Sequence, residues 1–204
     1  MIDVSADFRK LERMLADIPQ RQLPFAMSLA LNDTAKDVKL AEERQMERKL
    51  DRPTPFTKRG VYVRGSTKKS LTVWIGIKDH QAAYLKWQAG GGVRKPKGRA
   101  LVIGAGLRRN KYGNLPRNAV ARAVTKPNTF ATKRNGRGKH LAPGIYQRGR
   151  KVRGKTKLKL LVAFEPRAKY QPRFPFQATA RRTAEGAMQS HLLRRIKQAV
   201  ETAR

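Results

Sequence analysis

Apolar residues recur every three or four positions in three stretches of this chain, which is the spacing of an amphipathic helix. The stretches span residues 3–18, 24–50 and 176–200, and Pro24 suits the first turn of the second. The polar run Asn32–Thr34 fits a helix interior weakly. We interpret it as a patch that faces solvent, with a kink or a contact to a neighbouring element as the alternatives. The periodicity thus predicts helices near both ends of the chain.

Between these helices apolar and polar residues alternate, which is the pattern of a strand with one buried face. Residues 61–77 predict a β-hairpin. A strand that runs from Lys157 to Phe164 is expected to pair with that hairpin in a sheet of at least three strands, and the C-terminal helix is expected to cover the sheet. Together these expectations describe an α+β fold, with terminal α-helices packed on a small antiparallel sheet.

Three shorter elements are predicted between the hairpin and the last strand. Residues 79–88 have the pattern of a short helix that ends at a run of three glycines. Residues 101–103 predict a short strand, and residues 118–124 a helical turn.

A corner rich in proline and aromatic residues precedes the C-terminal helix. It combines fixed backbone angles with large apolar side chains, so we expect an extended, packed segment with a role in packing and assembly. The residues assigned to that role are Pro24, Tyr170, Pro172, Phe174, Pro175 and Phe176.

Charge changes the picture of the middle of the chain. No acidic residue occurs between Asp79 and Glu165, although Lys and Arg recur throughout, and the whole chain carries a net charge of +33. A surface of one sign repels itself unless an anion lies against it, so the missing anion is expected to come from outside. We therefore divide the chain into a framework domain, residues 1–89 and 156–204, and a basic, Gly-rich insertion, residues 90–155.

The insertion is expected to meet a polyanion, either DNA or an acidic protein neighbour. The alternative is a disordered, solvated arm, but Tyr112, Phe130 and Tyr146 are interleaved with the cations, which favours ordering against a partner. No motif for base-specific recognition is present, so DNA would be contacted through phosphates and without sequence preference. The residues predicted to face the polyanion are Arg94, Lys95, Lys97, Arg99, Arg108, Arg109, Lys111, Lys133, Arg134, Arg148, Arg150, Lys151 and Arg153.

The sequence offers no constellation typical of an enzyme, a metal site or a cofactor site. His80, His140 and His191 are far apart in sequence, and the carboxylates lie mostly on predicted helix faces. Gly104–Gly106 matches neither the Walker nor the dinucleotide-binding pattern. No apolar run approaches the roughly 18 residues of a membrane span, and the absence of Cys suits a reducing compartment. We therefore expect a non-enzymatic protein with no cofactor and no membrane partner.

Two stretches are similar to a known family: Pro24-Phe-Ala-Met-Ser-Leu-Ala-Leu-Asn-Asp-Thr-Ala35, and the Tyr170–Phe176 corner that leads into a terminal helix. Their order resembles the minor tail protein Z, or tail-completion, family of long-tailed bacteriophages. The resemblance implies helices packed on a small sheet and a ring, commonly hexameric, at the end of the tail tube where it meets the head. It covers the terminal parts of the chain and not the insertion.

On this resemblance we expect a structural virion protein of the head–tail junction, assembled in the host cytoplasm as a homo-oligomeric ring that lines or caps the DNA path. Its partners would be the tail tube or terminator, the head-neck proteins and DNA. A different class stays open, because the net charge and the basic loops argue for it equally well: a free-standing, non-specific nucleic-acid-binding protein of the ribosomal or nucleoid type.

Overall fold

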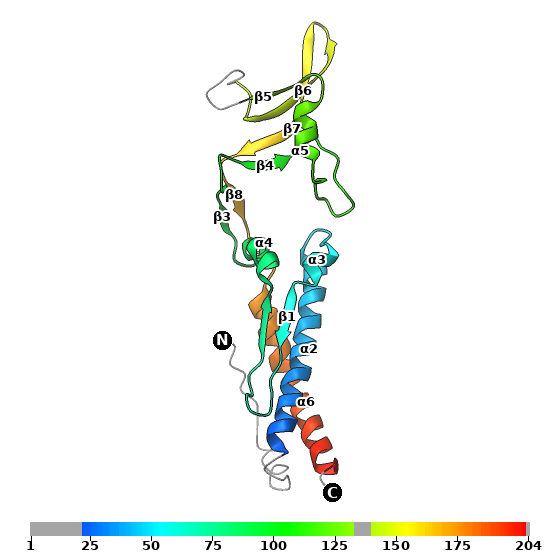
Figure 1. Ribbon diagram of the computed structural model, residues 1–204, viewed down its shortest axis with the longest axis vertical. Coiled ribbons are helices and arrows are strands. Elements are labelled where there is room, and N and C mark those ends of the chain that lie inside the picture. The colour runs from blue at the N-terminus through cyan, green and yellow to red at the C-terminus, as the bar shows by residue number, and fades with distance from the viewer. Residues whose placement is uncertain (1–21, 133–139, 203–204) are drawn as a thin grey trace. The chain divides into compact units, whose positions relative to one another are not determined.

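The computed structural model describes residues 22–132 and 140–202 (Figure 1). The helix expected over residues 3–18 lies outside them, as do Lys133 and Arg134. The chain divides into two compact units: a helical unit formed by residues 1–90 with 172–204, and a basic unit formed by residues 91–171. The described residues form helices and small antiparallel sheets, which confirms the predicted α+β fold.

Two long helices form the spine of the helical unit. Helix α2 (Leu23–Lys49) has a proline in its first turn, as predicted, and α6 (Phe176–Thr202) packs along it (Figure 1). Ala26 and Ala30 of α2 meet Leu192 and Ile196 of α6 in a buried cluster. The small alanine side chains let the two backbones approach closely, while the larger residues of α6 fill the seam between them.

A hairpin and two short helices complete the helical unit. Strands β1 (Val61–Arg64) and β2 (Trp74–Ile77) pair antiparallel, as the alternation predicted. Helix α3 (Pro55–Lys58) precedes them and α4 (Asp79–Gly90) follows, the latter also as predicted. The inward face of the hairpin packs into a second buried cluster, whose fully enclosed members are Met46, Val61, Leu85 and Phe174.

The proline-aromatic corner is fixed by backbone and ring contacts. Phe174 is completely buried, and its ring lies 5.9 Å from that of Phe176. The backbone N–H groups of Arg173 and Phe174 both donate to the Gln88 carbonyl, at 2.7 and 2.9 Å. The corner therefore ties the end of α4 to the start of α6.

The basic unit has a sheet and a core of its own. Strands β4 (Leu101–Gly104), β7 (Lys155–Glu165), β6 (Gly144–Val152) and β5 (Thr129–Thr132) lie side by side in that order, all antiparallel. Helix α5 (Ala119–Thr125) packs on this sheet. The buried core consists of Ala123, Ile145, Leu161 and Val162. Strands β3 (Gly92–Arg94) and β8 (Ala168–Tyr170) form a separate pair.

The structure corrects the predicted path of the last strand. The strand expected from Lys157 exists as β7, but it pairs with β4 and β6 instead of the first hairpin. The physical reason is local: β6 and β7 are joined by a two-residue turn, so their pairing closes the shortest available loop. The hairpin β1–β2 thus remains a two-stranded sheet, and the compact basic unit extends to Gln171 instead of ending at residue 155.

Helix α6 packs mainly along α2, a contact that was not predicted, and its first residue, Phe176, packs against the buried cluster that contains the inward face of the hairpin. Apolar periodicity shows that a helix has a buried face but does not show which element covers it.

None of the helices in the described ranges is long and apolar enough to cross a membrane.

Candidate nucleic-acid interface

Positive charge is concentrated in the basic unit. Residues 91–171 contain 23 of the 47 Lys and Arg residues of the chain but one of its 14 acidic residues, a net charge of +22 within the total of +33. The other 13 acidic residues belong to residues 1–90 and 172–204. Within the unit, Glu165 is the one carboxylate side chain available to balance this excess of cations.

Part of this charge stands on a two-stranded ribbon, residues 148–159, made by the end of β6 and the start of β7. Strand β5 pairs with β6 only as far as Gln147, and β4 pairs with β7 only from Val162 onward. In the described part of the basic unit no third strand pairs with the ribbon, and all twelve of its residues are exposed. Seven of the twelve are basic and none is acidic: Arg148, Arg150, Lys151, Arg153, Lys155, Lys157 and Lys159.

The strand register explains how so many cations fit on one ribbon. Arg148 stands opposite Leu158, Lys151 opposite Thr156, and Lys155 opposite Val152. Like charges directly opposite one another destabilise a strand pair, and this register gives each of these cations a neutral partner. The ribbon therefore holds its charge without direct cross-strand repulsion at these positions.

The tip and the base of the ribbon are both defined by local structure. At the tip, Arg153 and Gly154 have φ angles of +49° and +76°. Two successive positive φ angles are typical of a two-residue hairpin turn, whose backbone twist matches the twist of the two strands that it joins. At the base, the Arg148 guanidinium lies 4.5 Å above the Phe130 ring, which in turn stacks on Tyr146 with 5.9 Å between ring centroids. The Tyr146 hydroxyl donates to the Ala142 carbonyl at 3.0 Å. This aromatic pair anchors the ribbon to the sheet.

None of the seven ribbon cations forms an ion pair with another described residue; the ion pairs found within the described ranges all lie in the helical unit. Exposed guanidinium and ammonium groups without counterions are the groups that proteins use to hold phosphates. The ribbon is therefore the strongest candidate for a polyanion contact.

The other residues predicted to face a polyanion fall into two further places. Arg94 lies on β3, and Lys95, Lys97 and Arg99 follow it, all exposed. Strand β3 pairs with β8 and with neither strand of the ribbon, so strand pairing does not join this group to the ribbon.

The second place is the loop after β4. There Arg109 is engaged in holding the loop, because its guanidinium donates to the Gly104 and Gly113 carbonyls at 2.6 and 3.4 Å. Lys111 lies 5.1 Å from the centroid of the Tyr112 ring, and Arg108 is exposed. In this loop Arg108 is thus better placed than Arg109 to reach a partner.

The residues predicted to face the polyanion did not include Lys155, Lys157 and Lys159. Lys157 and Lys159 were assigned to a strand of the framework, and Lys155 to the last position of the insertion. The sequence does contain an indication of this hairpin. Arg153-Gly154 lies between two alternating stretches, and a two-residue segment that ends in Gly is typical of a tight hairpin turn, although Asn-Gly would indicate it more strongly.

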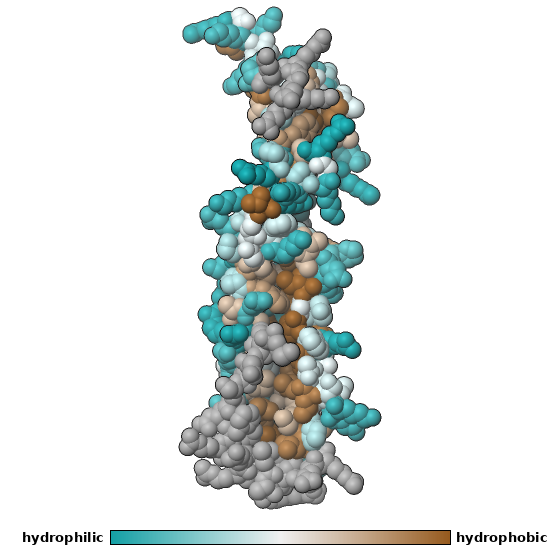
Figure 2. Space-filling view, turned by 90° about the vertical axis from the view of Figure 1, so that its left-hand side faces the viewer, coloured by the Kyte–Doolittle hydropathy of each residue, from teal (hydrophilic) through white to brown (hydrophobic). Residues whose placement is uncertain are grey.

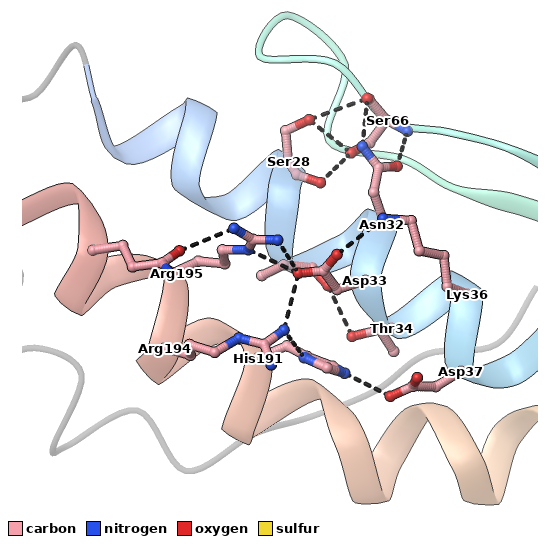
Figure 3. A network of polar contacts seen from close by, with 12 residues as sticks. Ser28, Asn32, Asp33, Thr34, Lys36, Asp37, Ser66, His191, Arg194 and Arg195 are labelled. Carbon is pink, nitrogen blue, oxygen red and sulfur yellow. Dashed lines mark hydrogen bonds and ion pairs between the residues drawn. The ribbon is translucent and has the colours of Figure 1, made fainter.

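A second polar cluster joins α2 to the hairpin and to α6 (Figure 3). The Asn32 side chain donates to the Ser66 carbonyl at 3.1 Å and accepts from the Ser66 N–H at 2.8 Å. Asp33 accepts hydrogen bonds from Arg195 at 2.7 Å and Arg194 at 3.0 Å. Asp33 is 8% exposed and Thr34 3%. The prediction of a solvent-facing patch was therefore wrong, and contact with neighbouring elements is what these residues provide.

Charged hydrogen bonds in this cluster join α2 to α6. Burial alone would raise the pKa of the Asp33 carboxyl, but hydrogen bonds from Arg195, Lys36 and Arg194 outweigh it and lower that pKa below its ordinary value. Arg194 can only donate, so the His191 Nδ1 that it meets at 2.8 Å accepts, and His191 Nε2–H donates to Asp37 at 2.6 Å. Each of these polar groups has a partner within the chain, so the cluster holds α2 and α6 together.

One buried group has no such partner. Glu42 of α2 is fully buried, and neither carboxyl oxygen has a hydrogen-bond partner among the described residues. Burial raises the pKa of Glu42 to about 8, and the nearby Ala180 backbone amide offsets the rise only in part, without meeting hydrogen-bond geometry. At this pKa most of the Glu42 carboxyl is protonated at neutral pH.

Among the described residues, no group of three or more His, Cys, Asp or Glu side chains is placed to hold a metal ion. Comparisons with protein families, with curated proteins and with solved structures found no match for this chain.

Proposed function

We propose that this chain is a structural protein whose basic unit contacts the phosphates of DNA, and that it does so at the head–tail junction of a long-tailed phage. The observation that carries the proposal is the ribbon, in which twelve consecutive exposed residues hold seven cations and no acid. A surface of this kind binds polyanions by releasing their condensed counterions, which requires no base recognition.

The dimensions of the ribbon suit a duplex. Five residues of extended strand span about 17 Å at roughly 3.3 Å per residue, and B-DNA presents one phosphate charge per about 1.7 Å of its axis. Several ribbon cations can therefore meet phosphates at once. A two-stranded ribbon also has a width that the major groove accommodates.

The phage assignment is supported by the resemblance of the Pro24–Ala35 stretch and of the Tyr170–Phe176 corner to the tail-completion family. In that setting the chain would form a homo-oligomeric ring, and the helical unit would supply the subunit contacts. The distribution of charge is compatible with this division, because the helical unit carries +11 of the net charge of +33 and the basic unit +22, so two copies repel one another less through their helical units.

Salt dependence of duplex binding tests the proposal. Affinity for unrelated duplexes should be equal within error, and log K should fall with log salt by about 0.9 per phosphate neutralised. Replacing Arg148, Arg150, Lys151 and Arg153 together by Gln should flatten this slope by up to about four contacts. The melting temperature should be nearly unchanged, with a small decrease from the loss of the contact between Arg148 and the Phe130 ring.

A control variant removes the same charge from exposed positions of the helical unit, by changing Arg44, Arg48, Arg181 and Arg182 to Gln. It should keep nearly the whole slope. If the two variants lose the slope equally, net charge and not the ribbon governs binding, and the proposed role of the ribbon fails.

The ribbon would serve a free-standing nucleic-acid-binding protein equally well, and assembly separates the two functions. Size-exclusion chromatography with light scattering, run at high salt after nuclease treatment, should give a ring or a monomer that assembles only on tails if the protein is a virion component. Stable one-to-one complexes with RNA would favour the free-standing protein.

A further inference from the structure

The outer face of the β1–β2 hairpin exposes two aromatic side chains. The helical unit leaves apolar side chains at its surface (Figure 2), and Trp74 is exposed to 59% and Tyr62 to 42%. In the strand register Tyr62 stands opposite Gly76, and Arg64 opposite Trp74. Opposite residues share a face, and so do alternate residues of one strand, so these four residues lie together on the face turned away from the buried cluster.

The arrangement on this face leaves the rings available. A Cβ added at Gly76 would lie 2.9 Å from the Tyr62 ring, so Tyr62 covers the place where a side chain would otherwise stand on β2. Trp74 lies two residues before Gly76 on the same strand. The Arg64 guanidinium has no hydrogen bond or ion pair with another described residue. Two rings and an unengaged guanidinium thus share one small surface.

The surroundings of this face are positively charged. Residues 52–78 include seven Lys and Arg residues and no acidic residue. Two of these cations, Lys68 and Lys69, are exposed in the loop that joins the strands. Charge complementarity therefore favours an anion as the occupant of this face.

We infer that this face binds single-stranded nucleic acid, with bases stacked on Trp74 and Tyr62 and phosphates held by Arg64 and the loop lysines. Aromatic side chains on the face of a sheet are a recurring platform for unpaired bases, and stacking on them is tolerant of sequence. A duplex keeps its base faces inside the stack and could use only the cations. The site is separate from the ribbon and does not depend on the function proposed for it.

The test uses the full chain with the four ribbon substitutions to Gln already in place, so that binding at the ribbon is weakened. Trp87→Phe leaves Trp74 as the single fluorescent reporter, because the chain has two Trp residues. A short oligothymidylate should quench the Trp74 emission, whereas polyphosphate of equal charge should bind without comparable quenching. Trp74→Ala or Tyr62→Ala should each weaken oligothymidylate binding about tenfold, measured by anisotropy of a labelled strand.

Conservative variants and a neighbouring apolar residue serve as controls. Trp74→Phe and Tyr62→Phe should recover most of the affinity because they keep a ring, and Leu71→Ala in the same hairpin, with 39% exposure, should change nothing. Unchanged Trp74 emission at saturating oligothymidylate would overturn the inference. So would a Trp74→Ala variant that binds oligothymidylate normally but loses self-association in light scattering, since the face would then be a contact between copies. Either result leaves the salt-dependence test of the ribbon untouched.

Discussion

Glu42 gives the prediction whose size can be worked out most directly from the structure. Its carboxyl is fully buried between α2 and α6, and no described residue forms a hydrogen bond with it. Burial raises its pKa from 4.5 to about 8. Because the folded state holds the proton more tightly, this group favours folding fully below pH 4.5, and its contribution is lost as the pH rises towards 8.

The magnitude follows from the linkage between protonation and folding. Each pH unit between the unfolded and folded pKa values is worth about 1.4 kcal/mol, so ionising Glu42 in the folded protein costs on the order of 4 to 5 kcal/mol. Between pH 5.5 and 8 the free energy of unfolding should therefore fall by about 3 kcal/mol through this residue alone. That is a large fraction of the roughly 5 to 15 kcal/mol that stabilises a typical domain.

The assay is urea unfolding of wild-type protein and Glu42→Gln at pH 5.5 and 8.5. The variant cannot ionise, so its stability relative to wild type should grow with pH by about 3 kcal/mol. Glu42→Met, which also removes the unpaired polar atoms, should be more stable than wild type at both pH values. Glu43→Gln is the matched control, because Glu43 is only partly buried and should leave the wild-type pH dependence in place. If Glu42→Gln and wild type lose stability in parallel, Glu42 is hydrated or paired, and the reasoning about its burial is refuted.

Chemical denaturation tests three further predictions about the helical unit. Leu192→Asp places a charge in the buried seam and should lower the free energy of unfolding by about 4 kcal/mol or more. Glu201→Ala at the exposed end of the same helix should change it by less than about 0.5 kcal/mol. Equal effects would mean that the seam is not packed. Phe174→Ala should cost about 3 to 5 kcal/mol because the ring is fully buried, and a silent substitution would place the ring outside the core. Asp33→Ala leaves the Arg195 guanidinium without its carboxylate and should lower the free energy of unfolding by about 2 to 4 kcal/mol. If the two residues act as a pair, the double variant with Arg195→Ala should lose much less stability than the sum of the two single variants.

The elements of the fold could be predicted where one periodicity runs over many residues. Helices α2 and α6, the β1–β2 hairpin and α4 all follow from spacing, because each buries a face of its own. The pairing of β7 could not, since alternation marks a strand but carries no information about which edge it joins.

The composition of the candidate interface could be predicted, but its structure could not. The absence of acids marks the stretch that forms most of the basic unit, but it does not show that part of this stretch folds into a ribbon with twelve exposed residues. Exposure is a property of the whole unit, because it depends on where β4 and β5 end relative to β6 and β7. For the same reason the sequence does not distinguish Arg109 from Arg108, whereas the structure does, because the Arg109 guanidinium donates to two carbonyls of its own loop.

Glu42 shows a signal that was available and unused. The buried residues of α2 include one at every fourth position, namely Ala26, Ala30, Thr34, Val38, Glu42 and Met46. Glu42 occupies a position of this stripe, so its place in the sequence predicts a buried side chain. Residue type alone does not distinguish the burial of Glu42 from that of Glu43. The position of a residue in the stripe therefore carries more information than its chemistry.

Site-specific photo-cross-linking can detect the proposed contact between the ribbon and DNA. Thr156 is an exposed, neutral residue of the ribbon, and Gln189 is an exposed residue of α6 in the helical unit. Each is replaced in turn by p-benzoylphenylalanine, and the full-length protein is irradiated with duplex DNA at several salt concentrations. Cross-links should form from position 156, diminish as salt rises, and be absent or rare from position 189. Efficient cross-linking from position 189 with none from position 156 would show that DNA binds to the helical unit and not to the ribbon.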